Sequence, residues 1–176
     1  MHFLNIEQCA TADLSPSTMA ALQALCEAAY HEPMTSFLAD IGPGEHLLGW
    51  LGETLVSHLM WVTRWLQPAG LPALRTAYVE LVATDPTAQR LGYATRLLEA
   101  FPPRVQDFDL AALSPATEGL YTRLGWRLWR GPLAVREGDT VLPTPEDRVM
   151  VLELPRTPEL DSTSLVSVEW RPGELW

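Results

Sequence analysis

The residue that most needs an explanation is Glu80. It is the one carboxylate in residues 78–84, an otherwise apolar run that is typical of a buried strand. A strand covered on both faces does not normally accept a carboxylate, because a charge taken out of water is costly. A carboxylate held in such a place can take a proton from a reacting group. Glu80 is therefore the first candidate for a functional residue.

The turn after this strand is the second candidate. Asp85 and Pro86 break the strand, and a helix of about three turns follows, in which Leu91, Ala94, Leu97, Leu98 and Phe101 recur at helical spacing. The first N–H groups of a helix lack intrahelical partners and lie at the positive end of its dipole. Gly92 lets a phosphate approach the chain closely. The turn predicts a pyrophosphate site, although a simple strand-to-helix turn has the same spacing.

These candidates are positioned by an alternation of strands and helices. Ser15 or Ser17 is expected to cap the first helix, and Ser114 to cap a helix that begins at Pro115 and runs through Leu124. The Ser114 hydroxyl could equally face a ligand. Residues 31–44 are expected as a loop or a broken short helix. We expect strands at residues 2–8, 46–51, 55–66, 78–84, 107–113, 126–135, 148–154 and about 165–168, with a polar loop through Asp139, Glu146 and Asp147.

Composition predicts one globular domain over residues 1–176, since 47% of the residues are hydrophobic and 19% are charged. No apolar run approaches the roughly 20 residues that span a bilayer, and the first residues do not resemble a signal peptide. We therefore expect a cytoplasmic protein that does not enter a membrane. The net charge of −10 argues against a nucleic-acid partner and would attract a cation.

The cysteines and histidines indicate neither a disulfide framework nor a metal site. Cys9 and Cys26 are too few for a framework, and neither lies in a Cys-x-x-Cys or Cys/His cluster. The four histidines show no metal-ligand spacing, and an isolated histidine is more often structural than catalytic. We expect no metal.

Two motifs carry a resemblance to a known family. Gln89, Gly92 and Ala94 fit the pattern Gln/Arg-x-x-Gly-x-Gly/Ala, which resembles the acetyl-coenzyme A loop of the GCN5-related N-acetyltransferases. Downstream, the segment from Tyr121 to Gly125 and Trp126 resembles the second signature of that family, a Tyr-x-x-x-Gly-aromatic turn. Two motifs in the right order are much stronger than one.

The resemblance implies a fold and a co-substrate. The fold is an α/β (α+β) arrangement, a central mixed and mostly antiparallel sheet flanked by helices, with a splay between two parallel strands. The co-substrate is acetyl-coenzyme A. By the resemblance, Val82 and Thr84 offer main-chain hydrogen bonds to pantetheine, and the pyrophosphate is held by the amides of Gln89, Arg90, Leu91, Gly92, Tyr93 and Ala94.

The second half of the chain also resembles the aminoglycoside 2'-N-acetyltransferases. The similar segments are YVE at residues 78–80, LYTRLGWRLWRGPLAV at 120–135, TPED at 144–147 and the ending EWRPGELW. The resemblance implies an aminoglycoside substrate, antibiotic resistance, Glu80 as general base acting through water and Tyr121 as general acid. It also leaves a homodimer open, since members of this family often form dimers.

Both roles agree with the chemistry of acetyl transfer. An attacking amine must be neutral, so a carboxylate can accept its proton, and a phenol can protonate the leaving thiolate. The aminoglycoside is expected to meet the acidic loop and the end of the chain, where the α-carboxylate of Trp176 would pair with an ammonium group. The expected substrate-binding residues are Glu32, Ser114, Glu146, Asp147, Glu174 and Trp176.

Two other functions remain open. The same scaffold could acetylate another small amine or a protein N-terminus. It could also be a coenzyme A-binding module without catalysis, which would need neither Glu80 nor Tyr121.

Overall fold

The computed structural model describes residues 3–173 and 175–176, and for residues 35–37 it describes the backbone alone. The chain forms two compact units. The first holds the residues up to Val62 together with Val79–Phe101, and the second holds Thr63–Tyr78 and Pro102–Trp176. Strands β3 (Thr54–Pro68) and β4 (Leu74–Thr84) contribute residues to both units, and each unit is described by itself. That residues 1–176 form a single domain stays a prediction.

The strands of the first unit are β1 (Asn5–Ala10), β2 (Glu45–Leu51), the first part of β3 and the last part of β4. β1 pairs antiparallel with β2, and β2 pairs antiparallel with β3. The β2–β3 hairpin turns at Gly52 and Glu53, as the sequence predicts, and Gly52 has a positive φ of 60°. This register places His58 of β3 opposite Leu48 of β2.

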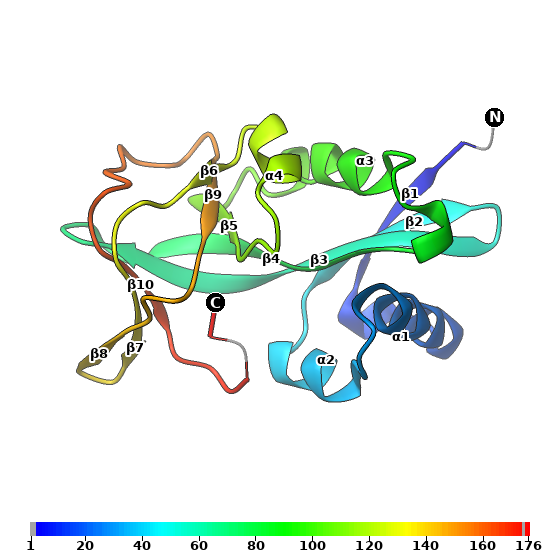
Figure 1. Ribbon diagram of the computed structural model, residues 1–176, viewed down its shortest axis with the longest axis horizontal. Helices are drawn as coiled ribbons and strands as arrows, with labels where there is room; N and C mark the ends of the chain where they lie inside the picture. The colour runs from blue at the N-terminus through cyan, green and yellow to red at the C-terminus, as the bar shows by residue number, and fades with distance from the viewer. Residues whose placement is uncertain (1–2, 174) are drawn as a thin grey trace. The chain divides into compact units, whose positions relative to one another are not determined.

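The helices of this unit are α1 (Pro16–Tyr30), α2 (Thr35–Ile41) and α3 (Tyr93–Ala100), with short 3₁₀ turns at Thr11–Asp13 and Pro86–Ala88. Figure 1 shows α1 and α3 on opposite sides of the strands. Ser15 caps α1 as predicted, since its Oγ accepts the Thr18 N–H at 3.1 Å. α3 is shorter than the predicted three turns, because Leu91 lies before it and is 61% exposed.

The second unit contains a mixed sheet. β5 (Leu110–Leu113) pairs parallel with β4 and antiparallel with β9 (Met150–Glu153), which also pairs with β6 (Arg127–Leu128). β3 pairs antiparallel with β10 (Val166–Glu169), and β10 pairs parallel with β7 (Leu133–Glu137). β7 pairs antiparallel with β8 (Thr140–Pro143). A 3₁₀ turn at Pro102–Arg104 and helix α4 (Gly119–Arg123) complete the unit.

Two local predictions in this unit are wrong. The helix expected from Pro115 begins only at Gly119, and Ser114 does not cap it. Its N-cap is Glu118, whose carboxylate contacts Arg148 instead of a helical N–H. The polar loop expected after residue 138 contains strand β8, in which Val141 is 50% exposed. An edge strand without a buried face lacks the alternation by which strands are predicted.

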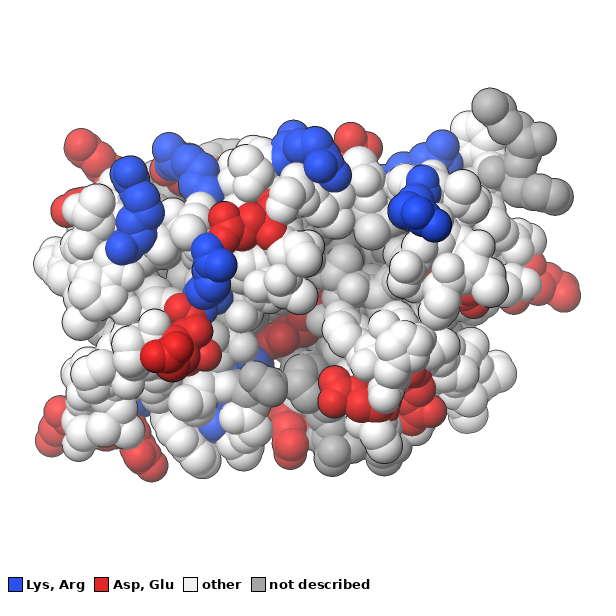
Figure 2. All heavy atoms as spheres, viewed as in Figure 1, with Lys and Arg blue, Asp and Glu red and all other residues white. Residues whose placement is uncertain are grey.

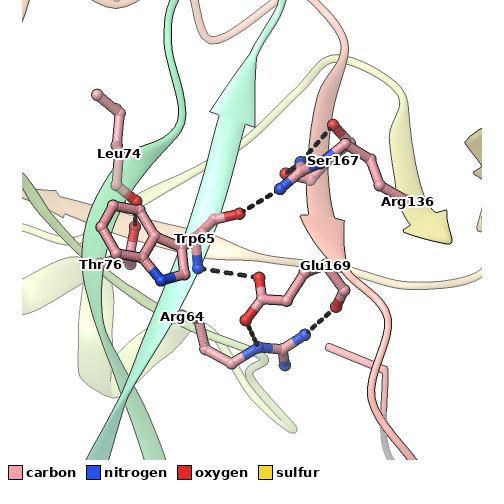
Figure 3. A network of polar contacts seen from close by, with 7 residues as sticks. All are labelled: Arg64, Trp65, Leu74, Thr76, Arg136, Ser167 and Glu169. Atoms are coloured by element: carbon pink, nitrogen blue, oxygen red, sulfur yellow. Dashed lines mark hydrogen bonds and ion pairs between the residues drawn. The ribbon is translucent and has the colours of Figure 1, made fainter. Parts of the chain in front are cut away.

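A polar network ties β3 to β10 and β7 in this unit (Figure 3). Arg64, only 3% exposed, donates through Nε to the Glu169 carboxylate at 3.0 Å and through Nη2 to the Glu169 carbonyl at 2.7 Å. Arg136 donates to the carbonyls of Trp65 and Ser167. Burial lowers the pKa of Arg64, while Glu169 opposes that shift. The Glu169 carboxylate therefore offsets the cost of burying the charged guanidinium of Arg64.

Candidate active site

Glu80 lies on β4 in the first unit and is 8% exposed. The next residue, Leu81, has a positive φ of 50°, a conformation that residues with a side chain rarely adopt. The Leu81 carbonyl accepts a hydrogen bond from His58 Nδ1 at 3.0 Å. The predicted base thus stands directly before an irregular point in the strand, and such points are frequent at functional sites.

The next carbonyls of β4 also have side-chain partners. The Val82 carbonyl accepts from the Tyr30 hydroxyl at 3.0 Å, and the Ala83 carbonyl accepts from Ser57 Oγ at 3.1 Å. Thr84 Oγ1 lies 2.9 Å from the same Ser57 hydroxyl. Val82 and Thr84 are half-buried. Main-chain bonds from these two residues to pantetheine stay a prediction.

The predicted pyrophosphate loop lies between β4 and α3. Arg90 and Gly92 both have positive φ angles, 63° and 83°. The helix begins with the Arg96 N–H donating to the Gly92 carbonyl at 3.0 Å, so the N–H groups of Tyr93 and Ala94 precede the first intrahelical donor. These N–H groups are available to an anion by the geometry of the helix.

The loop has room for a phosphate at Gly92. A Cβ added to this glycine would meet no heavy atom within 4 Å, so the backbone there is open to a ligand. Gln89, Arg90 and Leu91 are exposed, and Gln89 Nε2 donates to the Thr84 carbonyl at 3.4 Å. The residues expected to hold the pyrophosphate therefore fit an anionic group that approaches the start of α3.

Tyr121 lies on α4 in the second unit. Its ring meets that of Trp126 edge to face, with centroids 6.1 Å apart. Burial raises the pKa of the Tyr121 phenol above its usual value near 10, so the hydroxyl is protonated at neutral pH. The backbone N–H of Trp126 donates to the backbone carbonyl of Tyr121 at 3.1 Å. Gly125 lies between them, and its φ of 87° makes this turn possible. The turn therefore fixes Tyr121 and Trp126 together.

The second unit also brings Trp176 to the acidic loop. Trp176 is 4% exposed, and its indole Nε1 donates to Thr144 Oγ1 at 2.8 Å. The same loop holds Glu146 and Asp147, both exposed, and the Asp147 N–H donates to the Thr144 carbonyl at 3.2 Å. The expectation that Trp176 packs against the body is confirmed.

The remaining predicted substrate residues follow the ends of other elements or lie outside the described part. Glu174 lies outside the described residues. Ser114 is exposed after the end of β5. Glu32 is exposed after the end of α1, two residues from Tyr30, whose hydroxyl reaches β4. Figure 2 shows side chains of both charges on one face, and some of the opposite charges lie directly against one another.

Tyr30 and His58 are the residues that the sequence did not indicate. Tyr30 ends a regular helical pattern, and His58 lies within an apolar strand, so neither has a local motif. Both donate to carbonyls of β4 that are 52 and 23 residues away in the chain. Only hydrogen bonds between distant segments reveal them.

Residues 13–129 match the family described as the acetyltransferase (GNAT) domain. The chain belongs to this family. Acetyl-coenzyme A is the co-substrate of the family, as the sequence predicts. A stretch of 111 residues is 36% identical to an aminoglycoside 2'-N-acetyltransferase of Mycolicibacterium fortuitum. That match covers 59% of this chain and 57% of the relative, so it spans little more than half of each protein.

Solved structures confirm the predicted GNAT fold. One of them is YhbS from Escherichia coli, a GNAT family N-acetyltransferase crystallised in complex with CoA. It superposes with a TM-score of 0.60 at 16% identity, over 93% of this chain and 88% of that one. ElaA from Escherichia coli gives a TM-score of 0.59 at 17% identity, over 86% of this chain and all of that one. Among the described residues, no helix of this GNAT protein is long and apolar enough to cross a membrane.

Proposed function

We propose that this protein transfers an acetyl group from acetyl-coenzyme A to an amino group of an aminoglycoside, the 2'-amine, in the cytoplasm. The observation that carries the substrate class is the 36% identity to the aminoglycoside 2'-N-acetyltransferase of Mycolicibacterium fortuitum. Acetylation turns a charged amine into a neutral amide and would thereby protect the cell from the antibiotic.

Glu80 is the proposed general base. Acetyl-coenzyme A supplies the acetyl group as a thioester. Glu80 takes the proton that the amine releases as its nitrogen bonds to the acetyl carbon, either directly or through a water molecule. Its near-complete burial and its position beside the bend at Leu81 support this role.

Tyr121 is the proposed general acid. When the carbon–sulfur bond breaks, the Tyr121 hydroxyl gives its proton to the sulfur, so that coenzyme A leaves as a neutral thiol. The phenol holds its proton at neutral pH, as a general acid must, while its raised pKa makes that proton harder to give up. Solvent then removes the proton that Glu80 gained and returns a proton to Tyr121.

The transfer is direct and needs no acyl-enzyme. Burial raises the pKa of the Cys26 thiol to about 12, so Cys26 is not a thiolate at neutral pH. The pKa of Cys9 is also raised, by burial and by the nearby Asp13, Glu7 and Glu45. A thiol that keeps its proton is a poor nucleophile, which favours attack by the amine itself.

The aminoglycoside is proposed to meet Glu146 and Asp147 in the acidic loop, beside Trp176. Ammonium groups of the substrate would form charge-assisted bonds with these exposed carboxylates. The net charge of −10 would also draw a cationic substrate toward the protein. Glu32, Ser114 and Glu174 are proposed as further contacts.

The test is the release of free thiol from acetyl-coenzyme A with aminoglycosides, polyamines and peptides with free N-termini offered in parallel. Turnover with aminoglycosides that carry a 2'-amine, and none with matched compounds that carry a 2'-hydroxyl, is the expected result. Turnover with polyamines or peptides alone would indicate an acetyltransferase for another small amine or a protein N-terminus. Coenzyme A binding without turnover on any amine would identify a binding module.

A further inference from the structure

The interior of the first unit contains a pair of histidines that form one continuous hydrogen-bonded chain. His46 of β2 is 1% exposed and His58 of β3 is fully buried. His46 Nδ1 lies 2.9 Å from His58 Nε2. Thr11 Oγ1 lies 2.8 Å from His46 Nε2, and the Leu81 carbonyl lies 3.0 Å from His58 Nδ1. All four ring nitrogens therefore have a polar neighbour.

The protons in this chain can be placed from its two ends. A carbonyl only accepts, so His58 carries a proton on Nδ1 toward Leu81. If His58 is neutral, its Nε2 accepts from His46 Nδ1, and the Nε2 of a neutral His46 accepts from the Thr11 hydroxyl. Thr11 Oγ1 in turn accepts the Gly44 N–H at 2.9 Å and lies 3.0 Å from the Gly44 carbonyl. When both rings are neutral, the contacts of the two rings run in a single direction, and His46 Nε2 shares the one Thr11 proton with the Gly44 carbonyl.

Burial supports this neutral state. It lowers the pKa of His58 to about 3, and the neighbouring His46 adds to that shift. It lowers the pKa of His46 to about 4, although the carboxylate of Glu45 opposes the shift. Both rings therefore hold one proton each at neutral pH. In each neutral ring one of the two nitrogens carries the proton, and the hydrogen-bond partners determine which one it is.

The hydrogen-bonded chain of the two histidines ends at Leu81, where the backbone conformation is unusual. Leu81 has a φ of 50°, and a residue with a side chain is strained in this region unless its surroundings hold it. The N–H of His58 is the side-chain donor that reaches its carbonyl. Cys26 Sγ, 4.0 Å from the same nitrogen, is a weaker partner. The ring of His58 thus holds the conformation of the residue that directly follows Glu80.

We propose that His58 is a positioning residue for Glu80, and that His46 and Thr11 keep its ring in the tautomer that can donate to Leu81. This inference rests on the proposed function, in which Glu80 is the base. His58 itself does not touch the substrate in this scheme. It fixes the backbone bend that directs the carboxylate, and a displacement of about 1 Å at a reacting group can cost about 100-fold in rate.

The matched variants are His58→Asn and His58→Leu. Asparagine and leucine have the same branched skeleton of four side-chain heavy atoms, although the methyl groups of leucine are bulkier. Asparagine alone keeps an N–H donor near the position of Nδ1. We expect His58→Asn to keep kcat within about three-fold and His58→Leu to lower it about 10- to 100-fold, with KM for acetyl-coenzyme A nearly unchanged. Equal losses in the two variants, or full activity in His58→Leu, would overturn the proposal.

A double substitution separates this inference from the proposed function. If His58 acts through Glu80, His58→Leu should cost almost nothing further in a Glu80→Gln background. An equal loss in both backgrounds would sink the inference and leave the proposed base intact. Full activity of Glu80→Gln itself would instead remove the proposed base, and the positioning role with it.

The tautomer is measured in the unmodified protein, without any turnover. Long-range ¹H–¹⁵N spectra at neutral pH should show a proton on Nδ1 and none on Nε2 for both buried rings. This readout remains valid even if His58→Leu does not fold. A proton on Nε2 of His58 would leave Nδ1 without a hydrogen to donate to Leu81, and the proposal would be wrong.

Discussion

The indole of Trp176 donates a hydrogen bond to the hydroxyl of Thr144 at 2.8 Å. This bond joins two segments of the second unit that are 32 residues apart, and it ties Trp176 to the loop that holds Glu146 and Asp147. The loop is the part of this unit where a cationic substrate is proposed to bind. The bond therefore supplies a direct test of that proposal.

Trp176→Phe and Thr144→Val each remove this bond while they keep most of the packing. A lost hydrogen bond of this kind costs about 1 kcal/mol. We expect KM for the aminoglycoside to rise about five-fold in either variant, with KM for acetyl-coenzyme A unchanged. Trp170→Phe is the control, because Trp170 is 48% exposed. Steady-state kinetics of the three variants check the prediction, and equal behaviour of all three would contradict it.

Glu80→Gln should lower kcat about 10²- to 10⁴-fold, because glutamine keeps the shape of the side chain but cannot accept the proton of the amine. The loss should shrink as the pH rises, since more of the substrate amine is then already neutral. Kinetics between pH 6 and 9 measure this dependence. A loss confined to KM for the amine would make Glu80 a binding carboxylate and not a base.

Tyr121→Phe serves as the companion variant and should lower kcat with little change in either KM, because the phenol acts only as the thiolate leaves. The ring contact with Trp126 does not involve the hydroxyl, so the fold should be preserved. A more acidic coenzyme A analogue, whose thiolate needs less protonation, should partly restore the rate. No restoration would argue against the acid role.

Gly92→Val should raise KM for acetyl-coenzyme A about ten-fold or more, because the added side chain would stand in the open space before α3. The matched control is Gly52→Val in the β2–β3 turn. Both glycines have a positive φ and open space at the Cβ position, so both variants carry a similar backbone strain. Isothermal titration with coenzyme A should therefore separate them. If both bind it equally well, the loop is not the pyrophosphate site.

The two buried histidines make stability depend on pH in the acid range. Their folded-state pKa values, about 3 for His58 and about 4 for His46, lie below the unfolded value of about 6.5. The unfolded chain therefore binds more protons as the pH falls from about 6.5 toward 4, and stability is lost in that window. Each histidine contributes at most about 1.4 kcal/mol per pH unit.

Denaturant unfolding between pH 7 and 4.5 checks this slope. His58→Asn should reduce the dependence of stability on pH by up to the contribution of one buried histidine. His31→Asn, at an exposed position, should leave that dependence unchanged. An unchanged slope in His58→Asn would mean that His58 does not contribute to the acid sensitivity.

The Arg64–Glu169 pair should matter far more to stability than the surface pairs of the same unit. Glu169→Gln leaves the 3% exposed guanidinium without its carboxylate, and we expect a loss of about 2–3 kcal/mol in the free energy of unfolding. The value lies below that of a fully buried pair because the Glu169 side chain is 37% exposed. Asp107→Asn, which breaks the exposed pair with Arg75, should cost less than about 1 kcal/mol. Equal losses would contradict the role of burial.

The sequence by itself determined the features that depend on neighbours in the chain. Ser15 predicted the start of α1, Gly52 the β2–β3 turn, and the spacing of Gln89, Gly92 and Ala94 the loop before α3. These signals are local, because a cap, a turn or a helix N-terminus is built from residues within a few positions of one another. Glu80 also stood out locally, as a charge in an apolar strand.

Tertiary structure decided what depends on distant partners. His46 and His58 are isolated in the sequence and joined by a hydrogen bond in the fold, and no local rule predicts the left-handed Leu81 that they support. Glu118 at the start of α4 also has a distant partner, because its side chain contacts Arg148, 30 residues away, and caps no helical N–H. Sequence periodicity reports which residues are buried. It does not report which buried polar atoms meet, because that depends on how strands far apart in the chain are placed in register.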